Sequence, residues 1–324
     1  MNTILGIDMA KAKFDVCLLR DGGQVRGRFA NSAEGMAKLH RWLATHGAEQ
    51  VHACLEATGR YGRDLAYFLH SQGHTVSIVN PQRIHAYSRS KLQRSKTDRL
   101  DAQLIADICR TQQPPATPLL TVPQEERQAL SRHLEALKHD RQRERNRLEA
   151  GTPSVHVRQA ITEHLDFLER QIQQLEQQLQ ELVQQDEQTR QQFALLLTIP
   201  GIGALTAAKF LAEVPDVRRF AQTTQLDAYA GLVPKVHQSG QSSHSGPLVK
   251  TGNAVLRTLF YMPALAAHRY NPIIAHLNQR LQRKGKAKMT IVVAAMRKLL
   301  HLAYGVLKTG KPFNPLHATT PHAP

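Results

Sequence analysis

The stretch that decides the fold reads Thr3-Ile-Leu-Gly-Ile-Asp-Met-Ala-Lys-Ala-Lys-Phe-Asp-Val-Cys-Leu-Leu19. It contains two short apolar runs, Ile4 to Ile7 and Phe14 to Leu19, on either side of a polar turn, which is typical of a β-hairpin. The first run is apolar on both faces, as expected of a strand buried in the middle of a sheet. It leads into Asp8, so we expect a carboxylate at the edge of a rigid core. Asp8 could simply cap the turn, and a metal-binding role depends on further acids that accompany it.

The composition is that of a soluble and strongly basic protein. The 324 residues are enough for two or three domains, and we find neither a signal peptide nor an apolar run long enough to cross a membrane. The net charge is +16, and residues 193–324 hold 16 Lys and Arg against 3 Asp and Glu, a local net charge of +13. This asymmetry indicates a nucleic-acid partner more than a merely solvated basic surface. The cysteines Cys17, Cys54 and Cys109 show no metal-ligand spacing and are expected to be small buried residues in a reducing cytoplasm.

The first third of the chain alternates between strand and helix patterns. The elements predicted after the hairpin are strands at 24–30, 51–57 and 75–79 and helices that begin at Ser32 and span 61–72. This order predicts an α/β domain with a mixed sheet. The strand at 51–57 carries Glu56 near its end, so Asp8 and Glu56 both fall at strand ends, where such sheets collect their chemistry.

Two more acids begin the next predicted helix, within residues 96–109. Asp98 and Asp101 are three residues apart and therefore share one helical face. Asp98 alone would suffice to stabilise the helix N-terminus by capping. Capping explains the second carboxylate on the same face less readily. Together, Asp8, Glu56, Asp98 and Asp101 predict a site for Mg²⁺ or Mn²⁺, because these ions prefer oxygen ligands and suit phosphodiester chemistry.

The middle of the chain reads as long helices. A proline-rich linker at 112–123 is the expected domain boundary, and a charged helix is predicted over 124–150. The helix that follows carries apolar residues at heptad spacing: Leu165, Leu168, Ile172, Leu175, Leu179 and Leu182. This seam predicts a coiled coil, either as a helical hairpin within one chain or as a contact between copies of the chain.

The last part of the chain is predicted to be all-α. Two short helices flank Ile199-Pro-Gly-Ile-Gly203, which is similar to the glycine turn of a helix–hairpin–helix element that binds phosphate, although a tight turn between core helices has the same pattern. The serine-rich segment 233–246 is expected to be a loop, and we interpret it as a functional insertion in a helical, basic domain. Three further helices are expected: 253–268, 272–282 and 288–308. Nucleic-acid contacts are assigned to glycines and basic residues of this half: Gly201, Gly203, Lys209, Lys235, Lys250, Arg257, Arg283, Lys284, Lys286 and Lys288.

Five motifs occur in a fixed order along the chain: Gly-Ile-Asp8-Met-Ala-Lys, Leu-Glu56-Ala-Thr-Gly, Lys-Thr-Asp98-Arg-Leu-Asp101-Ala, Ile-Pro-Gly-Ile-Gly203, and Ala-Gly-Leu-Val-Pro234 with Gln-Ser239-Gly. Together they resemble the DEDD transposases of bacterial insertion sequences, relatives of the Piv pilin-gene invertase, a family that includes recombinases guided by a bridge RNA. The resemblance implies a RuvC-like catalytic domain of the RNase H-like fold at 1–115. It also implies a coiled-coil segment at 124–192 and a C-terminal transposase domain at 193–324.

The resemblance also implies roles for individual residues. It makes Asp8, Glu56, Asp98 and Asp101 the Mg²⁺ ligands, and it makes Ser239 the nucleophile that becomes covalently attached to a DNA phosphate. The neighbouring hydroxyls remain alternatives to Ser239: Ser242, Ser243 and Ser245. The implied partners are double-stranded DNA of the element and of the target, a structured non-coding guide RNA, and further copies of the chain in a dimer or tetramer with a composite active site. The implied location is the bacterial cytoplasm, with no membrane.

Two other functions are compatible with the same residues. One is a metal-dependent nuclease, such as a Holliday-junction resolvase, that uses the four acids and water with no covalent step. The other is a non-catalytic nucleic-acid-binding scaffold, against which the intact set of acids argues. A covalent protein–DNA adduct distinguishes the recombinase from the nuclease.

Overall fold

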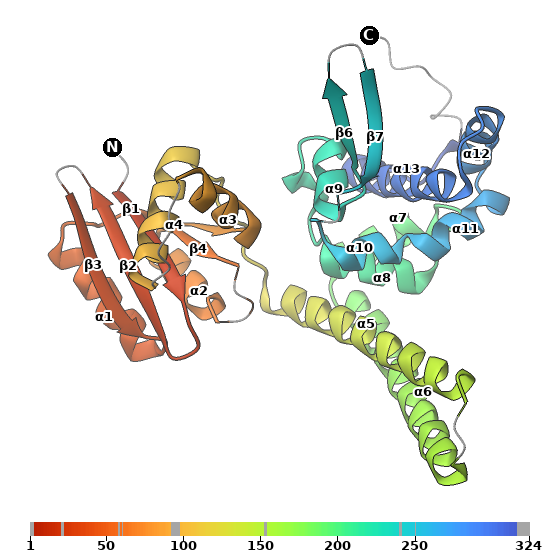
Figure 1. Ribbon diagram of the computed structural model, residues 1–324, viewed down its shortest axis with the longest axis horizontal. Helices are drawn as coiled ribbons and strands as arrows, with labels where there is room; N and C mark the ends of the chain where they lie inside the picture. Colours follow the sequence, from red (N-terminus) through yellow and green to blue (C-terminus); the bar gives the residue numbers. More distant parts are fainter. Residues whose placement is uncertain are drawn as a thin grey trace. The chain divides into compact units, whose positions relative to one another are not determined.

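The computed structural model describes residues 3–20, 23–57, 59, 61–91, 98–151, 154–239, 242–249 and 251–315. For residues 98–100, 236–239, 242–245 and 247 the description covers the backbone but not the side chains. The chain divides into two compact units, Met1–Leu119 and Leu120–Pro324. Figure 1 shows the first unit as a sheet with helices and the second as mostly helical.

The first unit is built on a five-stranded sheet in the order β3-β2-β1-β4-β5. Its strands are β1 (Thr3–Met9), β2 (Lys13–Arg20), β3 (Gly23–Ala30), β4 (Val51–Glu56) and β5 (Thr75–Val79). The central strand β1 is antiparallel to β2 and parallel to β4. The opening stretch therefore forms a hairpin, and the predicted mixed α/β sheet is confirmed.

Helices cover both faces of this sheet. One apolar cluster joins Leu5 and Ile7 of β1 to α1 (Ala33–Thr45) and α2 (Arg63–Ser71). A second cluster joins Ile4 to α3 (Pro81–Ser90) and α4 (Asp98–Gln112) on the other face. Neighbouring residues of a strand point to opposite faces, so the even-numbered positions of β1 face α4. This alternation explains why both faces of β1 read as apolar in the sequence.

At Gly6 the backbone of α4 packs tightly against the sheet. A Cβ atom at this position would lie 2.2 Å from the carbonyl oxygen of Ala102 and 2.3 Å from the amide nitrogen of Ala106. Both contacts are with helix backbone, which cannot move aside as a flexible side chain can. A glycine here therefore lets the helix that begins with Asp98 and Asp101 pack directly on the central strand.

Gly6→Ala is expected to destabilise the first unit by about 1–3 kcal/mol, the usual cost of overpacking a close contact. The matched control is Gly62→Ala, because Gly62 has an ordinary φ of −89° and its Cβ would meet a methionine side-chain carbon at 3.3 Å. Gly62→Ala should change the free energy of unfolding by less than about 1 kcal/mol. Urea unfolding of the whole chain measures both variants, and equal effects would contradict the packing described for Gly6.

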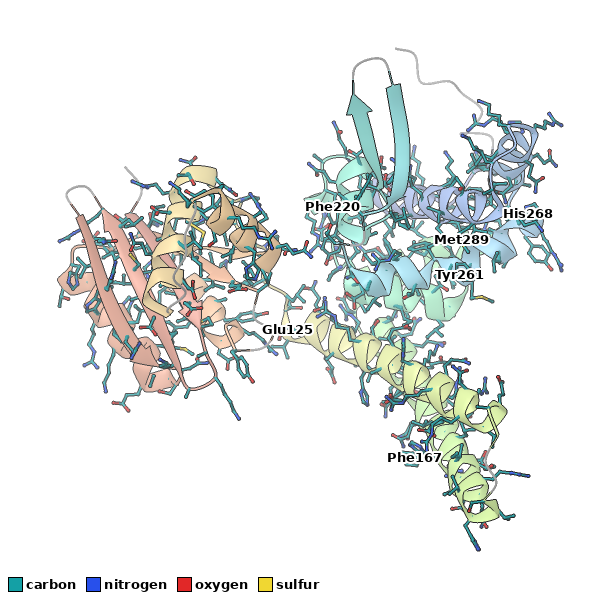
Figure 2. The ribbon with its side chains drawn as sticks, in the orientation of Figure 1. Glu125, Phe167, Phe220, Tyr261, His268 and Met289 are labelled. Atoms are coloured by element: carbon teal, nitrogen blue, oxygen red, sulfur yellow. A yellow bond between two sulfur atoms is a disulfide. The ribbon has the colours of Figure 1, made fainter. Side chains whose placement is uncertain are left out.

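The second unit begins with a helical hairpin. Helices α5 (Val122–Glu149) and α6 (Val155–Gln184) pack against each other within the chain. The ion pairs Lys138–Glu176 (2.6 Å) and Arg141–Glu169 (2.7 Å) connect the two helices. The predicted seam of α6 is buried at Leu168, Ile172 and Leu179. The apolar seam of α6 therefore packs within the same chain. Phe167, on the outside of α6, is 50% exposed (Figure 2). Association between copies stays a prediction.

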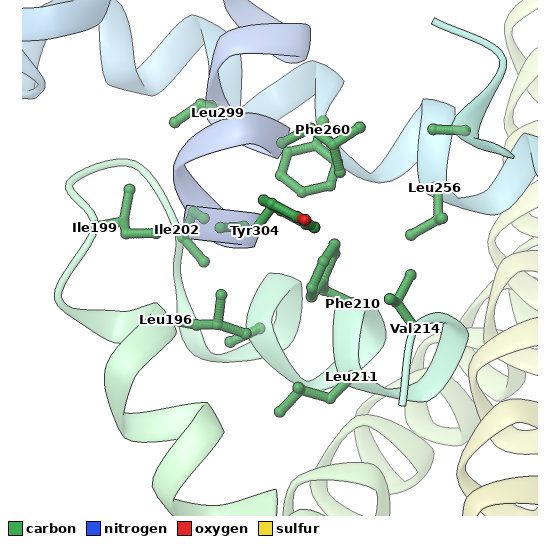
Figure 3. Packing of buried hydrophobic residues seen from close by; sticks show 14 of the residues in the cluster. Leu196, Ile199, Ile202, Phe210, Leu211, Val214, Leu256, Phe260, Leu299 and Tyr304 are labelled. Carbon is green, nitrogen blue, oxygen red and sulfur yellow. The ribbon is translucent and has the colours of Figure 1, made fainter. Parts of the chain in front are cut away.

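The remaining helices of the second unit surround one apolar core. They are α7 (Glu187–Leu197), α8 (Ala204–Glu213), the 3₁₀ helix η1 (Val217–Arg219), α9 (Thr223–Ala230), α10 (Ala254–Leu259), α11 (Tyr261–Tyr270), α12 (Pro272–Arg283) and α13 (Lys288–Thr309). Phe210 and Phe260 meet edge to face in the core, with ring centroids 5.8 Å apart, beside Tyr304 (Figure 3). The helix expected at 253–268 is divided into α10 and α11 at Phe260.

The prediction of an all-α C-terminal domain is wrong. Strands β6 (Pro234–Ser239) and β7 (Ser242–Leu248) form a two-stranded antiparallel sheet where the sequence suggested a loop. Serine and glycine are poor predictors of strands, but backbone hydrogen bonds between two strands do not depend on apolar side chains. A two-residue connection that begins with a glycine is a hairpin signal, and it was present at Gly240 in the sequence.

Helix α13 corrects a second expectation. By length and composition this helix could span a membrane, although the sequence analysis found no run long enough. Its apolar residues instead contribute to the core: Ile291, Ala295, Met296, Leu299, Leu300, Ala303, Tyr304 and Val306 are buried. The Tyr304 hydroxyl also donates a hydrogen bond to the carbonyl oxygen of Phe220 at 2.9 Å. A core helix that is apolar over most of its length meets the same composition test.

Candidate functional site

Asp8 and Glu56 lie at the same edge of the sheet. β1 and β4 are parallel, and their register pairs Gly6 with Cys54 and Ile7 with Leu55. Asp8 and Glu56 are the next residues of the two strands, so their positions are adjacent. Both residues are half-buried. Both also share the face on which Gly6 contacts α4.

The first turn of α4 carries the other two acids. Asp101 is half-buried and directly precedes Ala102, the residue whose carbonyl oxygen approaches Gly6. Asp98 is the first residue of α4, one turn before Asp101, and its side chain lies outside the described residues. The sheet register and the helix packing therefore place Asp8, Glu56 and Asp101 on one face, with Asp98 on the same first turn.

These residues fit a hard divalent cation. Carboxylate oxygens are the ligands that Mg²⁺ and Mn²⁺ prefer, and Mg²⁺ usually keeps some of its water molecules. The half-burial of Asp8, Glu56 and Asp101 suits this, because a partly buried carboxylate is stabilised by a nearby cation while water still reaches the ion. Three separate elements supply the acids, and each is held by a buried apolar cluster.

Ser239 ends β6, at the connection between the two strands of the hairpin. The backbone register pairs Ser239 with Ser242 and Gln238 with Ser243. The hairpin stands out from the helices of the second unit (Figure 1). Ser239 therefore belongs to the outer end of a projecting element. The side chains of these serines lie outside the described residues, so the register alone does not separate Ser239 from Ser242.

A buried ionic cluster that the sequence analysis missed lies between α9 and α13. Asp227 of α9 is fully buried and accepts a hydrogen bond from Arg297 Nε at 2.7 Å. The ring nitrogen Nε2 of His301 lies 2.8 Å from the same carboxylate oxygen. Helix α9 is thereby tied to α13 just before the chain enters β6. The sequence feature that could have indicated this cluster is Asp227 itself, because it is one of only three acids in the basic residues 193–324.

The glycine turn at 199–203 has a structural role at one of its two glycines. Gly201 has φ +102°, and a Cβ there would lie 2.6 Å from the Cβ of Ala267 on α11. Asn271 Nδ2 donates a hydrogen bond to the carbonyl oxygen of Pro200 at 3.1 Å. The turn is therefore packed against α11 on this side. Gly203, the N-cap residue of α8, is exposed. Phosphate binding by this turn stays a prediction.

The basic residues assigned to nucleic acid divide into surface and core positions. Lys209 is a core residue, because its side chain is 2% exposed and paired with Glu135 of α5. Burial lowers the pKa of Lys209, and the Glu135 carboxylate opposes that shift. Lys209 therefore does not belong to the basic surface. Arg257 is half-buried next to Gly231, and Lys250 lies outside the described residues. The exposed members of the set are Lys235, Arg283, Lys284, Lys286 and Lys288.

The cysteines also differ from expectation. Cys54 of β4 and Cys109 of α4 are joined as a disulfide with a Cα–Cα distance of 5.9 Å, whereas Cys17 is an unpaired, buried thiol of the described chain. The two bonded residues are 55 positions apart in the sequence, and this spacing gave no sign of the pairing. The prediction that all three cysteines are buried is confirmed, but Cys54 and Cys109 are not ordinary thiols, because the docking of α4 on the sheet brings them together as a disulfide.

Known proteins resemble this chain over nearly its full length. Residues 5–156 match a family model described as Transposase, and residues 193–279 match one described as Transposase IS116/IS110/IS902 family. The pilin gene-inverting protein of Moraxella bovis is 35% identical over 96% of this chain and 98% of its own length. The transposase for insertion sequence element IS1111A of Coxiella burnetii is 26% identical over 82% of this chain and 78% of its own length.

One solved structure is also similar to part of the chain. It is that of T. thermophilus RuvC in complex with a Holliday junction substrate, at 14% identity, and it covers 37% of this chain and 100% of that chain. The TM-score is 0.27. A score this low does not by itself assign a fold.

Proposed function

Because the chain belongs to the IS116/IS110/IS902 family of transposases and is therefore a DNA-recombining enzyme, we propose that it cuts and rejoins DNA through a covalent phosphoserine intermediate. Asp8, Glu56, Asp98 and Asp101 hold Mg²⁺ or Mn²⁺ in this proposal, and Ser239 is the nucleophile. The observation that carries the metal-dependent part is the meeting of β1, β4 and the first turn of α4 at one edge and one face of the sheet. The first unit acts in this proposal as a RuvC-like, RNase H-like domain.

In this proposal the four carboxylates coordinate the cation and hold it at a fixed position. When bound, the ion stabilises the negative charge that develops on the phosphate oxygens during strand cleavage. Asp8 and Glu56 come from neighbouring strands of a rigid sheet, so their separation is set by strand pairing and not by loop motion. The Gly6 contact fixes the height of α4, and with it the position of Asp101, above the sheet.

The serine carries the exchange of strands. In the first step the Ser239 oxygen forms a bond to phosphorus, the bond from phosphorus to a deoxyribose oxygen breaks, and the serine proton passes to the departing oxygen. A hydroxyl of another strand reverses these steps and releases the serine. The phosphodiester is conserved throughout, so rejoining needs no nucleotide hydrolysis. The position of Ser239 at the outer end of a projecting hairpin supports access to a large substrate such as DNA.

The family and the charge support a proposal for the substrates and partners. We propose that the chain recombines double-stranded DNA of an element with that of a target, in the bacterial cytoplasm. A structured guide RNA and further copies of the chain, as a dimer or tetramer with a composite active site, complete the assembly. The net charge of +13 over residues 193–324 supports a polyanionic partner for the second unit.

A plasmid recombination assay with the element ends, the target and co-expressed flanking RNA tests this function. Recombined junctions are expected with Mg²⁺ or Mn²⁺ and are expected to disappear with EDTA. Recombination that continues undiminished in EDTA would contradict the proposed metal requirement. Full activity in preparations without RNA would contradict the proposed need for a guide RNA.

The exposed turn between α12 and α13 is expected to bind phosphate. Replacing Arg283, Lys284 and Lys286 together with alanine should weaken nucleic-acid binding and flatten its salt dependence. The slope of log K against log salt should fall in magnitude by about 0.9 for each duplex phosphate contact that is lost. Affinity measured at four or five salt concentrations checks this.

The matched control for this variant is Lys38→Ala, because Lys38 is an exposed lysine of the first unit that pairs with Glu34 at 2.7 Å. Lys38→Ala should leave the slope unchanged. An unchanged slope in the triple variant as well would remove the α12–α13 turn from the interface.

A further inference from the structure

The disulfide between Cys54 and Cys109 connects the two elements that carry three of the four acids. Cys54 is two residues before Glu56 on β4, so both residues face α4. Cys109 is eight residues after Asp101 on α4, about two helical turns further along the same side. The Cα–Cα distance of 5.9 Å lies within the range that disulfides require. The bond therefore holds α4 onto the sheet beside the acidic edge, by which we mean the edge of the sheet formed by Asp8 and Glu56 together with Asp101 of α4.

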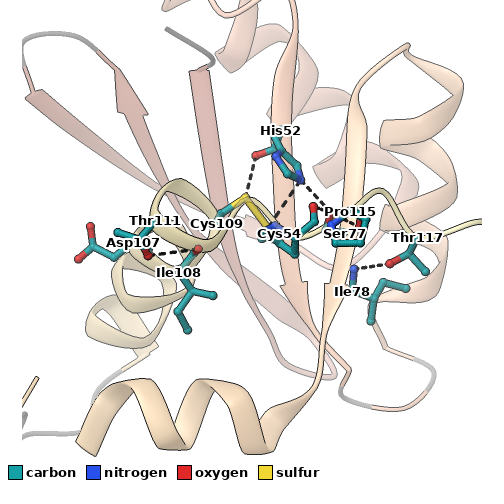
Figure 4. The surroundings of a disulfide bond; sticks show 11 residues. His52, Cys54, Ser77, Ile78, Asp107, Ile108, Cys109, Thr111, Pro115 and Thr117 are labelled. Carbon is teal, nitrogen blue, oxygen red and sulfur yellow. Dashed lines mark hydrogen bonds between the residues drawn. A yellow bond between two sulfur atoms is a disulfide. The ribbon is translucent and has the colours of Figure 1, made fainter. Parts of the chain in front are cut away.

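The surroundings of the two sulfurs are polar enough to support the reduced state as well (Figure 4). Cys109 Sγ lies 3.6 Å from the carbonyl oxygen of His52, which can accept a hydrogen bond from the thiol. His52 Nε2 lies 4.0 Å from Cys54 Sγ and 2.8 Å from Ser77 Oγ. The Ser77 hydroxyl in turn lies 3.0 Å from the carbonyl oxygen of Pro114. The cluster is an ordered polar network, which an inert apolar site for two cysteines would not need.

Cys17, the third cysteine, serves as an internal control for disulfide formation. The strand register places Cys17, Gly6 and Cys54 in one row across β2, β1 and β4. Cys17 and Cys54 are therefore two strand spacings apart, roughly 9 to 10 Å. This exceeds the distance of about 7 Å that a disulfide can bridge. Burial also raises the pKa of the Cys17 thiol, which keeps it unreactive.

We propose that Cys54 and Cys109 form a redox modification site, a reversible disulfide that clamps α4 onto β4 and so stabilises the acidic edge for metal binding. The oxidant is a low-molecular-weight disulfide. One cysteine sulfur bonds to a sulfur of this compound, whose own S–S bond breaks, and one small thiol leaves with a proton. The second cysteine sulfur then bonds to the first, and the second small thiol leaves with the other proton. Two electrons pass from the cysteines to the small disulfide.

The clamp acts by limiting how far α4 can move away from the sheet. Both sulfurs are fully buried between α4 and the sheet, so they can exchange with a small thiol only when the helix opens. Reduction removes the covalent limit on that opening and leaves α4 held by its apolar contacts with Ile4 and Cys17. Opening moves Asp101 away from Asp8 and Glu56. The effect on metal binding rests on the proposed function of these acids, whereas the effect on α4 does not.

The first experiment measures the bond and the helix, without any activity. The full-length chain is equilibrated with mixtures of reduced and oxidised glutathione, alkylated and mapped by peptide mass. Cys54 and Cys109 are expected to change together while Cys17 remains a thiol. Reduction should speed amide hydrogen exchange in α4 and lower the melting temperature of the first unit by roughly 10 °C. The control Cys17→Ser should show the same redox dependence, and Cys109→Ser should show none.

Three results of this experiment would overturn the proposal. One is the absence of a Cys54–Cys109 peptide under oxidising conditions. Another is a bond that excess dithiothreitol cannot reduce without unfolding the chain. The third is a stoichiometric zinc ion in the reduced protein that is lost in Cys109→Ser, because His52, Cys54 and Cys109 also place their ligand atoms within 4.8 Å of one another. If Cys109→Ser does not fold, comparison of the oxidised and reduced native chain gives the same decision.

The second experiment measures Mn²⁺ binding by electron paramagnetic resonance in both redox states. Reduction is expected to raise the dissociation constant at least about fivefold in the native chain and in Cys17→Ser, but not in Cys109→Ser. Equal affinities in the two states would overturn the link between the clamp and the acids. A chain that binds no Mn²⁺ in either state would refute the proposed metal site, and the exchange of α4 amides would still decide whether the clamp exists.

Discussion

Asp101→Asn is expected to reduce metal-dependent strand cleavage at least roughly 10³-fold, which corresponds to about 4 kcal/mol of lost transition-state stabilisation. Asparagine keeps the size and the helix but removes one negative charge from the acidic edge, so the cation binds less tightly and in a changed position. Binding of DNA and RNA should stay within about twofold of the native value, because the basic surface of the second unit is unaltered. Single-turnover cleavage of a labelled substrate in Mg²⁺ and in Mn²⁺ gives the result.

The matched control is Asp107→Asn in the same helix. Asp107 belongs to the later part of α4, is half-buried, and pairs with the exposed Arg110 at 3.1 Å. This substitution makes the same chemical change away from the acidic edge and should leave cleavage within a few-fold of native. Equal losses in both variants would mean that the charge of α4 as a whole matters, and not the Asp101 position. Full cleavage in Asp101→Asn would remove this residue from the metal site.

Ser239→Ala is expected to abolish recombination completely, because alanine has no oxygen that can take over the phosphate. The free energy of unfolding should change by no more than about 0.5 kcal/mol, because alanine keeps the backbone pairing of Ser239 with Ser242. The effect on activity is thus separated from any effect on folding. Junction formation by polymerase chain reaction and urea unfolding of the purified variant measure the two quantities.

The neighbouring serines provide the controls for Ser239. Ser242→Ala and Ser243→Ala make the same change in β7, where the register pairs these residues with Ser239 and Gln238. Both variants should recombine at no less than about a tenth of the native rate, because a lost neighbouring hydroxyl costs at most one hydrogen bond to the substrate. Complete loss in Ser242→Ala with activity retained in Ser239→Ala would move the nucleophile to the opposite strand and leave the mechanism standing.

The sheet of the first unit could be predicted because its pattern is local. The two apolar runs that begin the chain, with a polar turn between them, specify a hairpin whatever the rest of the chain does. The positions of Asp8 and Glu56 at strand ends followed directly from the bounds of two strands. Their adjacency required the pairing of β1 with β4, which an α/β pattern with a parallel crossover implies.

Other features depend on contacts between distant residues, and the sequence did not reveal them. The Cys54–Cys109 pair exists because α4 docks at Gly6, and no spacing rule connects residues that far apart. Lys209 looked like a phosphate contact because lysine is rarely buried, yet Glu135 of α5 compensates its charge in the core. The β6–β7 hairpin was missed because its polar residues carry no alternating apolar pattern. In each case contacts between residues far apart in the sequence decide the structure, and the local sequence pattern does not reveal them.

The central claim is the covalent phosphoserine intermediate, and mapping the protein–DNA adduct tests it most directly. The native chain is incubated with guide RNA, Mg²⁺ and a nicked DNA substrate that cannot be rejoined, then denatured, digested with protease and examined by mass spectrometry. A nucleotide attached to the peptide that contains Ser239 is the predicted result, and it should be absent from Ser239→Ala. Cleaved DNA with a free phosphate at the cut and no attached peptide would contradict the account and identify the protein as a metal-dependent nuclease that uses water.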